Sequence, residues 1–200
     1  MNEHQWDRFL KIKTSGRDDS HADRYRYPYE PTPYKVLERL SSGGLITRKN
    51  RVLDYGCGKG RVGFFLSWQT RCRCLGIEID ERLWSAALKN KEDAVSGRRT
   101  EYIRTGAEAF SVPADVDRIY FFNPFSTEIL QKVMGKIRES WYDAPREILL
   151  FFYYPSDEYV SYLMTVDELC FLDETDCSDL FEGEDKRERI LIFRMNEGLL

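Results

Sequence analysis

Apolar residues follow two different spacings along most of this chain. Short apolar runs, typical of buried strands, predict strands over 51–55, 72–79, 101–105, 116–122, 147–153, 169–174 and 189–194. Between them, apolar residues recur every three or four positions, which is typical of amphipathic helices. This spacing predicts helices from Pro33 to the glycine pair at 43–44 and over 61–68, 81–95, 128–140 and 157–164.

The alternation of strands and helices predicts the fold class. Strands separated by helices form a parallel sheet that is covered by helices on both faces. The last two strands have no good helix between them, which indicates a hairpin and an antiparallel edge strand. We therefore expect a doubly wound, Rossmann-like α/β domain with a seven-stranded, mostly parallel sheet.

The first 35 residues differ from the rest of the chain. Residues 28–33 hold three prolines, which exclude a regular helix there, whereas 6–12 could form one short helix. We interpret 1–35 as an irregular arm over a domain of residues 36–200. The tyrosines of its second half should pack on that domain, because the arm cannot form a core of its own; they are Tyr25, Tyr27, Tyr29 and Tyr34.

Composition and charge narrow the class of protein. The 200 residues are 42% hydrophobic and 32% charged, as in a soluble globular domain. The longest apolar run, 148–154, is too short to span a membrane, and the N-terminus lacks the apolar stretch of a secretory signal. Five cysteines without a repeating frame favour the reducing cytoplasm. The net charge is −4, and no basic block is present, so nucleic acid is a disfavoured partner.

One segment carries the pattern of a cofactor site. Directly after the strand at 51–55 come three alternating glycines, Gly56, Gly58 and Gly60, which permit a tight turn and close approach of a ligand. Asp54 ends that strand, and Glu78 ends the next one, 24 residues later. A carboxylate at the second position can accept both hydroxyls of a ribose.

This constellation resembles the class I S-adenosylmethionine-dependent methyltransferases. The resemblance implies the strand order 3-2-1-4-5-7-6 and S-adenosyl-L-methionine as cofactor. It implies that Asp54 and the glycines hold the methionine part, Glu78 the ribose and Glu108 the adenine edge. The full set of cofactor-binding residues expected on this basis is Asp54, Tyr55, Gly56, Cys57, Gly58, Gly60, Glu78, Ile79, Ala107 and Glu108.

A second motif, Asn123-Pro124-Phe125, follows the fourth strand. It partly matches the Asn/Asp-Pro-Pro-aromatic motif of methyltransferases that act on amino groups, so we take these three residues as catalytic candidates. The alternative is that Asn123 caps a turn whose shape Pro124 sets. Tyr153 and Tyr154 should open onto the same crevice, because ligands bind at the carboxyl ends of such strands.

The likeness extends to a little-characterised bacterial group of methyltransferases. Its marks are the segment Tyr29-Glu-Pro-Thr-Pro33 and the run Gly58-Lys-Gly-Arg61, and the run also resembles, more distantly, the non-SET protein lysine methyltransferases. The acceptor implied is a nitrogen of a protein or of a small molecule. We expect the arm to form one wall of the acceptor pocket and to act as a lid, or else to be a purely structural element.

Two other functions remain open at this point. A nicotinamide-dependent oxidoreductase is disfavoured, because Arg61 stands where the third glycine of Gly-x-Gly-x-x-Gly would be. A cofactor-binding protein without catalysis, acting as a sensor or partner subunit, is the other alternative. Cys57, Cys72 and Cys74 have no evident fourth ligand nearby, so we expect no metal site.

Overall fold

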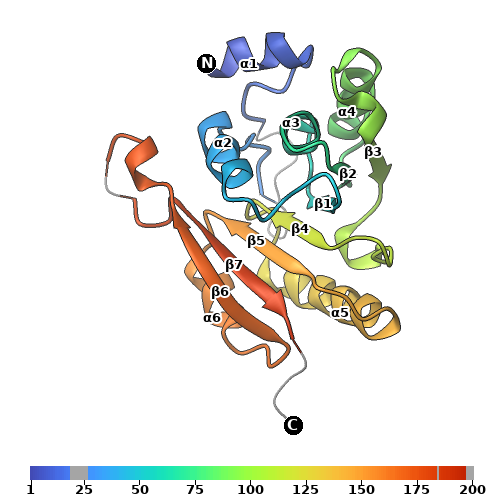
Figure 1. The fold of residues 1–200 in the computed structure, drawn as a ribbon, viewed down its shortest axis with the longest axis vertical. Helices are drawn as coiled ribbons and strands as arrows, with labels where there is room; N and C mark the ends of the chain where they lie inside the picture. Colours follow the sequence, from blue (N-terminus) through green and yellow to red (C-terminus); the bar gives the residue numbers. More distant parts are fainter. Residues whose placement is uncertain (19–26, 184, 197–200) are drawn as a thin grey trace.

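A seven-stranded sheet forms the centre of the computed structural model, which describes residues 1–18, 27–183 and 185–196 (Figure 1). The strand order is β3-β2-β1-β4-β5-β7-β6. Strands β1 to β5 pair in parallel, and β7 is antiparallel to both of its neighbours. The strands are β1 (Arg51–Tyr55), β2 (Arg73–Glu78), β3 (Thr100–Arg104), β4 (Arg118–Phe121), β5 (Leu149–Tyr153), β6 (Leu169–Asp176) and β7 (Arg189–Met195). The predicted fold class and strand order are confirmed.

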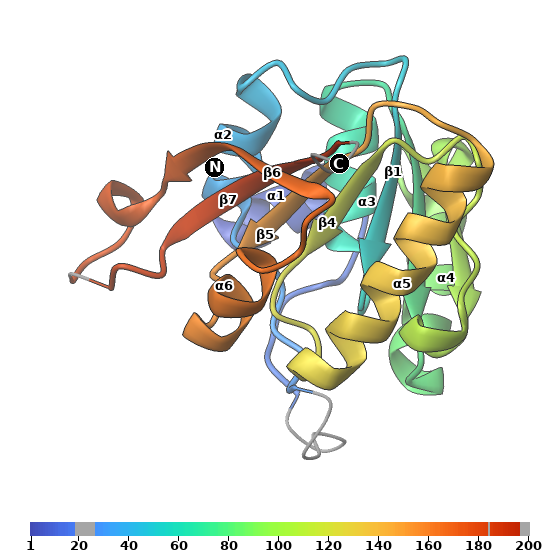
Figure 2. The same cartoon turned by 90° about the horizontal axis from the view of Figure 1, so that it is seen from below.

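Helices cover both faces of this sheet, because successive strand residues point to opposite sides. In β4, for example, Tyr120 joins the core on one face, and Ile119 and Phe121 join the core on the other. The first face is covered by α1 (Glu3–Leu10), α2 (Tyr34–Ser42), α3 (Arg61–Gln69) and α4 (Glu81–Asp93). The second face is covered by α5 (Thr127–Asp143) and α6 (Asp157–Leu163), which Figure 2 brings to the front. Short 3₁₀ turns lie at Gly97–Arg99, Ala107–Ala109 and Ser178–Leu180.

The N-terminal arm belongs to the first of these cores. Helix α1 begins three residues before the predicted start, because Asn2 and Gln5 form a reciprocal capping box. Its Trp6 stacks on Tyr34 with ring centroids 5.6 Å apart, and Leu10 is fully buried. Tyr29 and Tyr34 pack on the domain as expected, whereas Tyr27 is 41% exposed. Tyr25 lies outside the described residues. The boundary at residue 35 stays an expectation.

The last two strands form the predicted hairpin. The antiparallel strand β7 lies inside the sheet against β5, and β6 forms the edge. Strand β6 runs two residues further than predicted, because Thr175 and Asp176 continue the pairing with Ile190 and Arg189. Among the described residues, no helix combines the length and the apolar character needed to cross a membrane.

Candidate functional site

The loop between β1 and α3 turns through three left-handed glycines. The φ angles of Gly56, Gly58 and Gly60 are +72°, +53° and +87°, a conformation that other residues rarely adopt. The loop is fastened to β2, because the amides of Gly56 and Cys57 both donate to the carbonyl oxygen of Ile77 at 3.0 Å. This arrangement places the start of α3 beside the carboxyl ends of β1 and β2.

Each glycine of the loop also makes room for another part of the chain. A Cβ atom on Gly56 would lie 2.6 Å from the Cβ of Pro124, and one on Gly60 would lie 2.5 Å from the hydroxyl of Tyr102. A Cβ on Gly58 would overlap the ring of Tyr29, which comes from the arm. The glycines therefore let the 123–125 motif and the arm approach the loop closely.

A cavity of about 310 Å³ opens at the carboxyl ends of the central strands. One side of it is built by the ends of β1, β2 and β4, and the opposite side by residues 27–32 of the arm. Such a position, outside the strand ends of an open α/β sheet, is where ligands bind in this fold class. The expected residues that line the cavity are Asp54, Tyr55, Gly56, Cys57, Glu78, Ile79, Ala107, Glu108, Pro124 and Phe125.

Glu78 is held rigidly by backbone amides. Its Oε2 accepts from Gly58 at 2.9 Å, and its Oε1 accepts from Ile79 at 2.8 Å and from Asp80 at 2.9 Å. Burial raises the pKa of Glu78, and these three bonds oppose that effect. A carboxylate has about four acceptor positions, so capacity remains for a hydroxyl donor from the cavity.

Asp54 is the least satisfied acid of the cavity. It is only 3% exposed, and its enclosed Oδ2 has no hydrogen-bond partner among the described residues. Burial, and secondarily the charge of Glu78, raises the pKa of Asp54 to about 8. A buried acid without a partner is costly, so this atom marks a place for a ligand that donates hydrogen bonds or carries positive charge.

Two of the expected glycines lie outside the cavity lining. Gly58 is covered by Tyr29, and Gly60 lies against Tyr102, whose hydroxyl donates to the Gly60 carbonyl oxygen at 3.1 Å. Because Gly58 and Gly60 have no side chain, the rings of Tyr29 and Tyr102 can pack directly against the loop. Their contact with a cofactor stays a prediction.

The Asn123-Pro124-Phe125 motif is only partly at the cavity wall. Pro124 and Phe125 line it, whereas Asn123 does not. Asn123 has a left-handed backbone, with φ +42°, and its buried Oδ1 has no partner among the described residues. Phe125 is anchored from behind, because the Tyr159 hydroxyl donates to its carbonyl oxygen at 2.5 Å. The catalytic role of the three residues stays a prediction.

Tyr153 and Tyr154 do not line the cavity, contrary to expectation. Their hydroxyls turn to the segment before β7, to Glu188 and Asp185 respectively, both at 2.6 Å. Their rings pack behind Phe122, which does line the cavity, with the nearer pair of centroids 4.7 Å apart. The carboxyl end of β5 therefore packs against a residue of the cavity wall and does not itself line the cavity.

Several lining residues were not expected from the sequence. Thr32 and Tyr120 bridge the arm to β4 through hydroxyl oxygens 3.1 Å apart, and Phe122 and Arg61 also line the cavity. The proline- and tyrosine-rich composition of the arm indicated that it packs on the domain, but it did not show which of its residues would contact β4.

The fold and the site define a doubly wound domain with a ligand-sized cavity at its strand ends. Residues 52–141 match the model of a family described as "Methyltransferase domain". These residues therefore form a methyltransferase domain of the S-adenosylmethionine-dependent kind, whose cofactor is S-adenosyl-L-methionine. The residues fit that cofactor, because the unpartnered Asp54 oxygen suits its ammonium group and the anchored Glu78 suits its ribose hydroxyls.

Part of the chain is also similar to a protein of known activity. A protein-lysine N-methyltransferase from Saccharolobus islandicus is 34% identical over 73 residues, which is 36% of this chain and 45% of the relative. The match therefore spans less than half of that protein's length.

Solved structures share the fold. An RNA methyltransferase from Salinibacter ruber, in complex with S-adenosyl-L-homocysteine, superposes with a TM-score of 0.56 at 18% identity, over 86% of this chain and 97% of that one. A TehB-like S-adenosylmethionine-dependent methyltransferase from Corynebacterium glutamicum gives 0.59 at 18% identity, over 80% and 88% of the two chains.

Proposed function

We propose that this protein transfers the methyl group of S-adenosylmethionine to a nitrogen atom, and that the acceptor is the side-chain amine of a protein lysine. The observation that carries the proposal is the cavity itself, in which a buried unpartnered acid and an anchored acid face an aromatic wall. The segment shared with a protein-lysine N-methyltransferase supports the choice of acceptor.

The lining residues divide between the two substrates. Asp54, Gly56 and Cys57 would hold the methionine part, Glu78 the ribose, and Ile79, Ala107 and Glu108 the adenine. Pro124 and Phe125, with Phe122 and the arm, would then enclose the acceptor amine. In this reaction the lysine ammonium group first gives a proton to water. The nitrogen lone pair then forms a bond to the methyl carbon, and the carbon–sulfur bond breaks towards sulfur, which leaves S-adenosylhomocysteine. The protein's main contribution is to align the nitrogen and exclude water.

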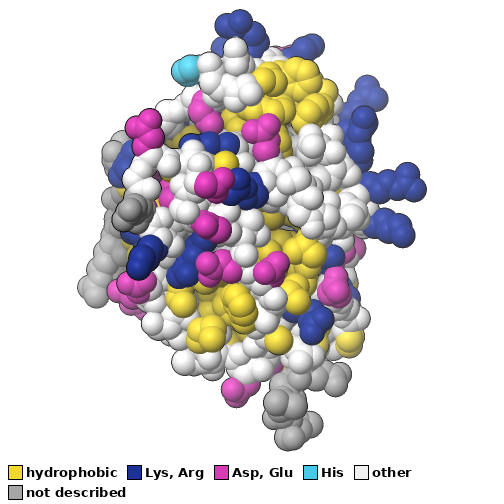
Figure 3. Space-filling model, turned by 60° about the vertical axis from the view of Figure 1, so that its left-hand side comes forward, with side chains coloured by type: hydrophobic (Ala, Val, Ile, Leu, Met, Phe, Trp, Pro, Cys, Tyr) yellow, Lys and Arg dark blue, Asp and Glu magenta, His cyan; other side chains and the backbone are white. Residues whose placement is uncertain are grey.

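The charge of the cavity wall favours an amine over a nucleic acid. Its acidic side chains are Asp18, Glu30, Asp54, Glu78, Asp80 and Glu108, against the guanidinium groups of Arg61 and Arg82. With Asp54 protonated, the acids still outnumber the two cations. A phosphate backbone is repelled by such a wall, and nucleic-acid binders usually present a basic surface. On the face shown in Figure 3, acidic and basic side chains are interspersed among hydrophobic ones over the described residues.

A cytoplasmic location is the last part of the proposal, and the five free cysteines support it.

The test is methyl transfer from radiolabelled S-adenosylmethionine to lysine-rich proteins, with the modified residue located by mass spectrometry. We expect label on lysine, and none on the same proteins after their amines are chemically blocked or on RNA. Label on RNA alone, or on no acceptor at all, would refute the proposed acceptor.

A matched variant tests the acceptor motif. Glycine tolerates the left-handed backbone of Asn123, so Asn123→Gly removes the side-chain oxygen with little strain. Because Asn123 lies outside the cavity lining, its unpartnered Oδ1 can orient the amine only if the motif turns towards the bound acceptor. On that account we expect transfer to fall about 100-fold in the variant, with cofactor affinity unchanged. Unchanged transfer would leave Asn123 as a turn residue.

A further inference from the structure

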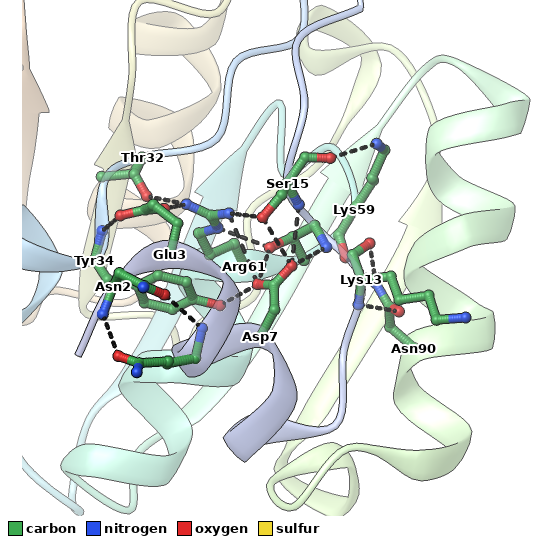
Figure 4. Close-up of polar contacts among 12 residues, drawn as sticks. Asn2, Glu3, Asp7, Lys13, Ser15, Thr32, Tyr34, Lys59, Arg61 and Asn90 are labelled. Carbon is green, nitrogen blue, oxygen red and sulfur yellow. Dashed lines mark hydrogen bonds and ion pairs between the residues drawn. The ribbon is translucent and has the colours of Figure 1, made fainter.

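Arg61 is a buried arginine whose partners all come from the N-terminal arm. It begins α3 directly after Gly60 and is only 3% exposed. Its Nε donates to Thr14 Oγ1 at 2.7 Å, and its Nη2 donates to Ser15 Oγ at 3.3 Å (Figure 4). Its Nη1 donates to the Thr32 carbonyl oxygen at 3.2 Å and also binds the carboxylate of Glu3.

These contacts engage four of the N–H donors of the guanidinium group. It has five N–H donors, and the remaining one lies on Nη2, which is 3.7 Å from an oxygen of Asp7. The group also lies over the ring of Tyr34, 4.3 Å from the centroid. Although Arg61 lines the cavity, four of its five donors bind the arm and the fifth faces Asp7, so it acts through the arm residues that it binds.

Asp7 extends the same network on the arm side. Its carboxylate accepts from the Thr14 amide at 2.7 Å, the Thr14 hydroxyl at 2.7 Å and the Tyr34 hydroxyl at 2.6 Å. Burial alone would raise the pKa of Asp7, but these hydrogen bonds lower it overall. A buried cation and a buried anion are thus joined through Thr14, in a network whose members all have partners.

The network holds the arm segment that lines the cavity at two points, Tyr29 and Thr32. The Tyr29 hydroxyl donates to the Thr14 carbonyl oxygen at 2.6 Å, and the Tyr29 backbone pairs with Asp18 through two hydrogen bonds of 2.9 and 3.0 Å. Thr32, at the end of the segment, is bound by Arg61 and contacts Tyr120. The ring of Tyr29 rests on Gly58.

We infer that Arg61 is a positioning residue, which clamps residues 27–32 onto the cofactor loop as a fixed wall of the acceptor pocket. Cofactor loop and acceptor wall then form one unit, because Arg61 starts the helix that follows the loop and binds the arm at Thr14, Ser15 and Thr32. The inference rests on the proposed function for what the wall encloses. The clamp itself is independent of the acceptor's identity.

Arg61→Lys tests the clamp while keeping the charge beside Asp7. Lysine provides three donors at one point and cannot span Thr14, Ser15 and Thr32. We expect acceptor kcat/KM to fall about 10- to 100-fold, since small misplacements are costly, with the Kd for S-adenosylmethionine within about threefold of wild type. Amide hydrogen exchange at Asp18 and Tyr29 should be at least about tenfold faster, because their pairing loses its support.

Two further variants guard against a folding defect. Tyr29→Phe keeps the ring on Gly58 and removes only the bond to Thr14, so it should show the same pattern, more weakly, in a stable protein. Arg51→Lys is the matched control, because Arg51 begins β1 at the far end and pairs with Asp115 and Glu101. It should change neither kinetics nor exchange at Tyr29.

The outcomes separate the clamp from the proposed function. Unchanged exchange and unchanged acceptor kinetics in Arg61→Lys would overturn the inference, as would an equal loss of cofactor affinity and acceptor kcat/KM. If the wild type transfers no methyl group, the proposed function fails, and hydrogen exchange alone then decides whether Arg61 clamps the arm.

Discussion

Asp54 shows a conflict between stability and function at the level of one residue. The folded protein raises the pKa of Asp54 from 3.8 to about 8, so the folded state keeps a proton that the unfolded state gives up. The stabilisation from this proton is fully present below pH 3.8 and is lost as the pH rises to about 8. Bound cofactor would offset the cost by supplying a cation.

Asp54→Asn should therefore stabilise the protein without ligand at high pH. Asparagine does not titrate, so we expect its Tm advantage over wild type to grow from about zero at pH 4 to about 5 °C or more at pH 8.5. The same change should weaken cofactor binding. Thermal unfolding measured across this pH range is the check, and parallel Tm curves for the two proteins would contradict the assignment.

The sequence specified some site residues well and others not at all. Asp54 and Glu78 could be predicted, because each ends a strand and the two strands are neighbours in the sheet. The contacts of Arg61 with Thr14 and Thr32 could not be predicted, because they join segments that no periodicity relates. Likewise, Gly58 was expected to admit a ligand, and the structure shows that it also admits Tyr29.

At the level of elements, hydrophobic spacing found the strands and helices of the domain. The errors lie at the ends: the predicted strand 116–122 is shortened to Arg118–Phe121. Val116 is apolar because it is buried in the preceding loop, and Phe122, which is half-buried, lines the cavity after the strand has ended. Helix α1 began earlier than predicted because its capping box is polar and leaves no apolar signal.

The element least defined by the sequence is the arm, and α1 offers a test of its role in folding. Leu10 is fully buried in the same core as α2 and α3. We expect Leu10→Ala to lower the free energy of unfolding of the whole domain by about 2–5 kcal/mol. The exposed neighbour Phe9, changed to alanine, should cost much less.

Denaturant unfolding followed by two probes is the measurement. Three further tryptophans are present, so the fluorescence of Trp6 beside α3 is obtained as the difference between the wild type and Trp6→Phe, and far-ultraviolet circular dichroism reports on the whole domain. Coincident transitions, shifted together by Leu10→Ala, would show that the arm unfolds with the domain. A loss confined to the fluorescence signal would show instead that the arm is a separate unit.

At the level of the whole molecule, the order of strands explains where the site lies. Strands β1 and β4 are adjacent in the middle of the sheet, and the chain leaves them in opposite directions, towards β2 and towards β5. Their carboxyl ends leave a crevice at that reversal. The order itself came from the family resemblance, because hydrophobic spacing cannot choose among strand orders.

The arm completes the crevice from outside the sheet. Its residues 27–32 line the same cavity as Asp54 and Glu78, so part of the wall comes from outside the sheet. Such a wall helps to keep water from the reacting atoms, as a methyl transfer requires.

Calorimetric titration of the purified protein with S-adenosylmethionine, S-adenosylhomocysteine and NAD tests the central claim most directly. We predict that the first two bind and that NAD does not. Glu78→Gln, which retains an oxygen for part of the backbone network, should weaken binding by about 1.5–3 kcal/mol, or roughly 10- to 150-fold in Kd. Binding of NAD alone, or an unchanged Kd in a folded Glu78→Gln protein, would contradict this account of the site.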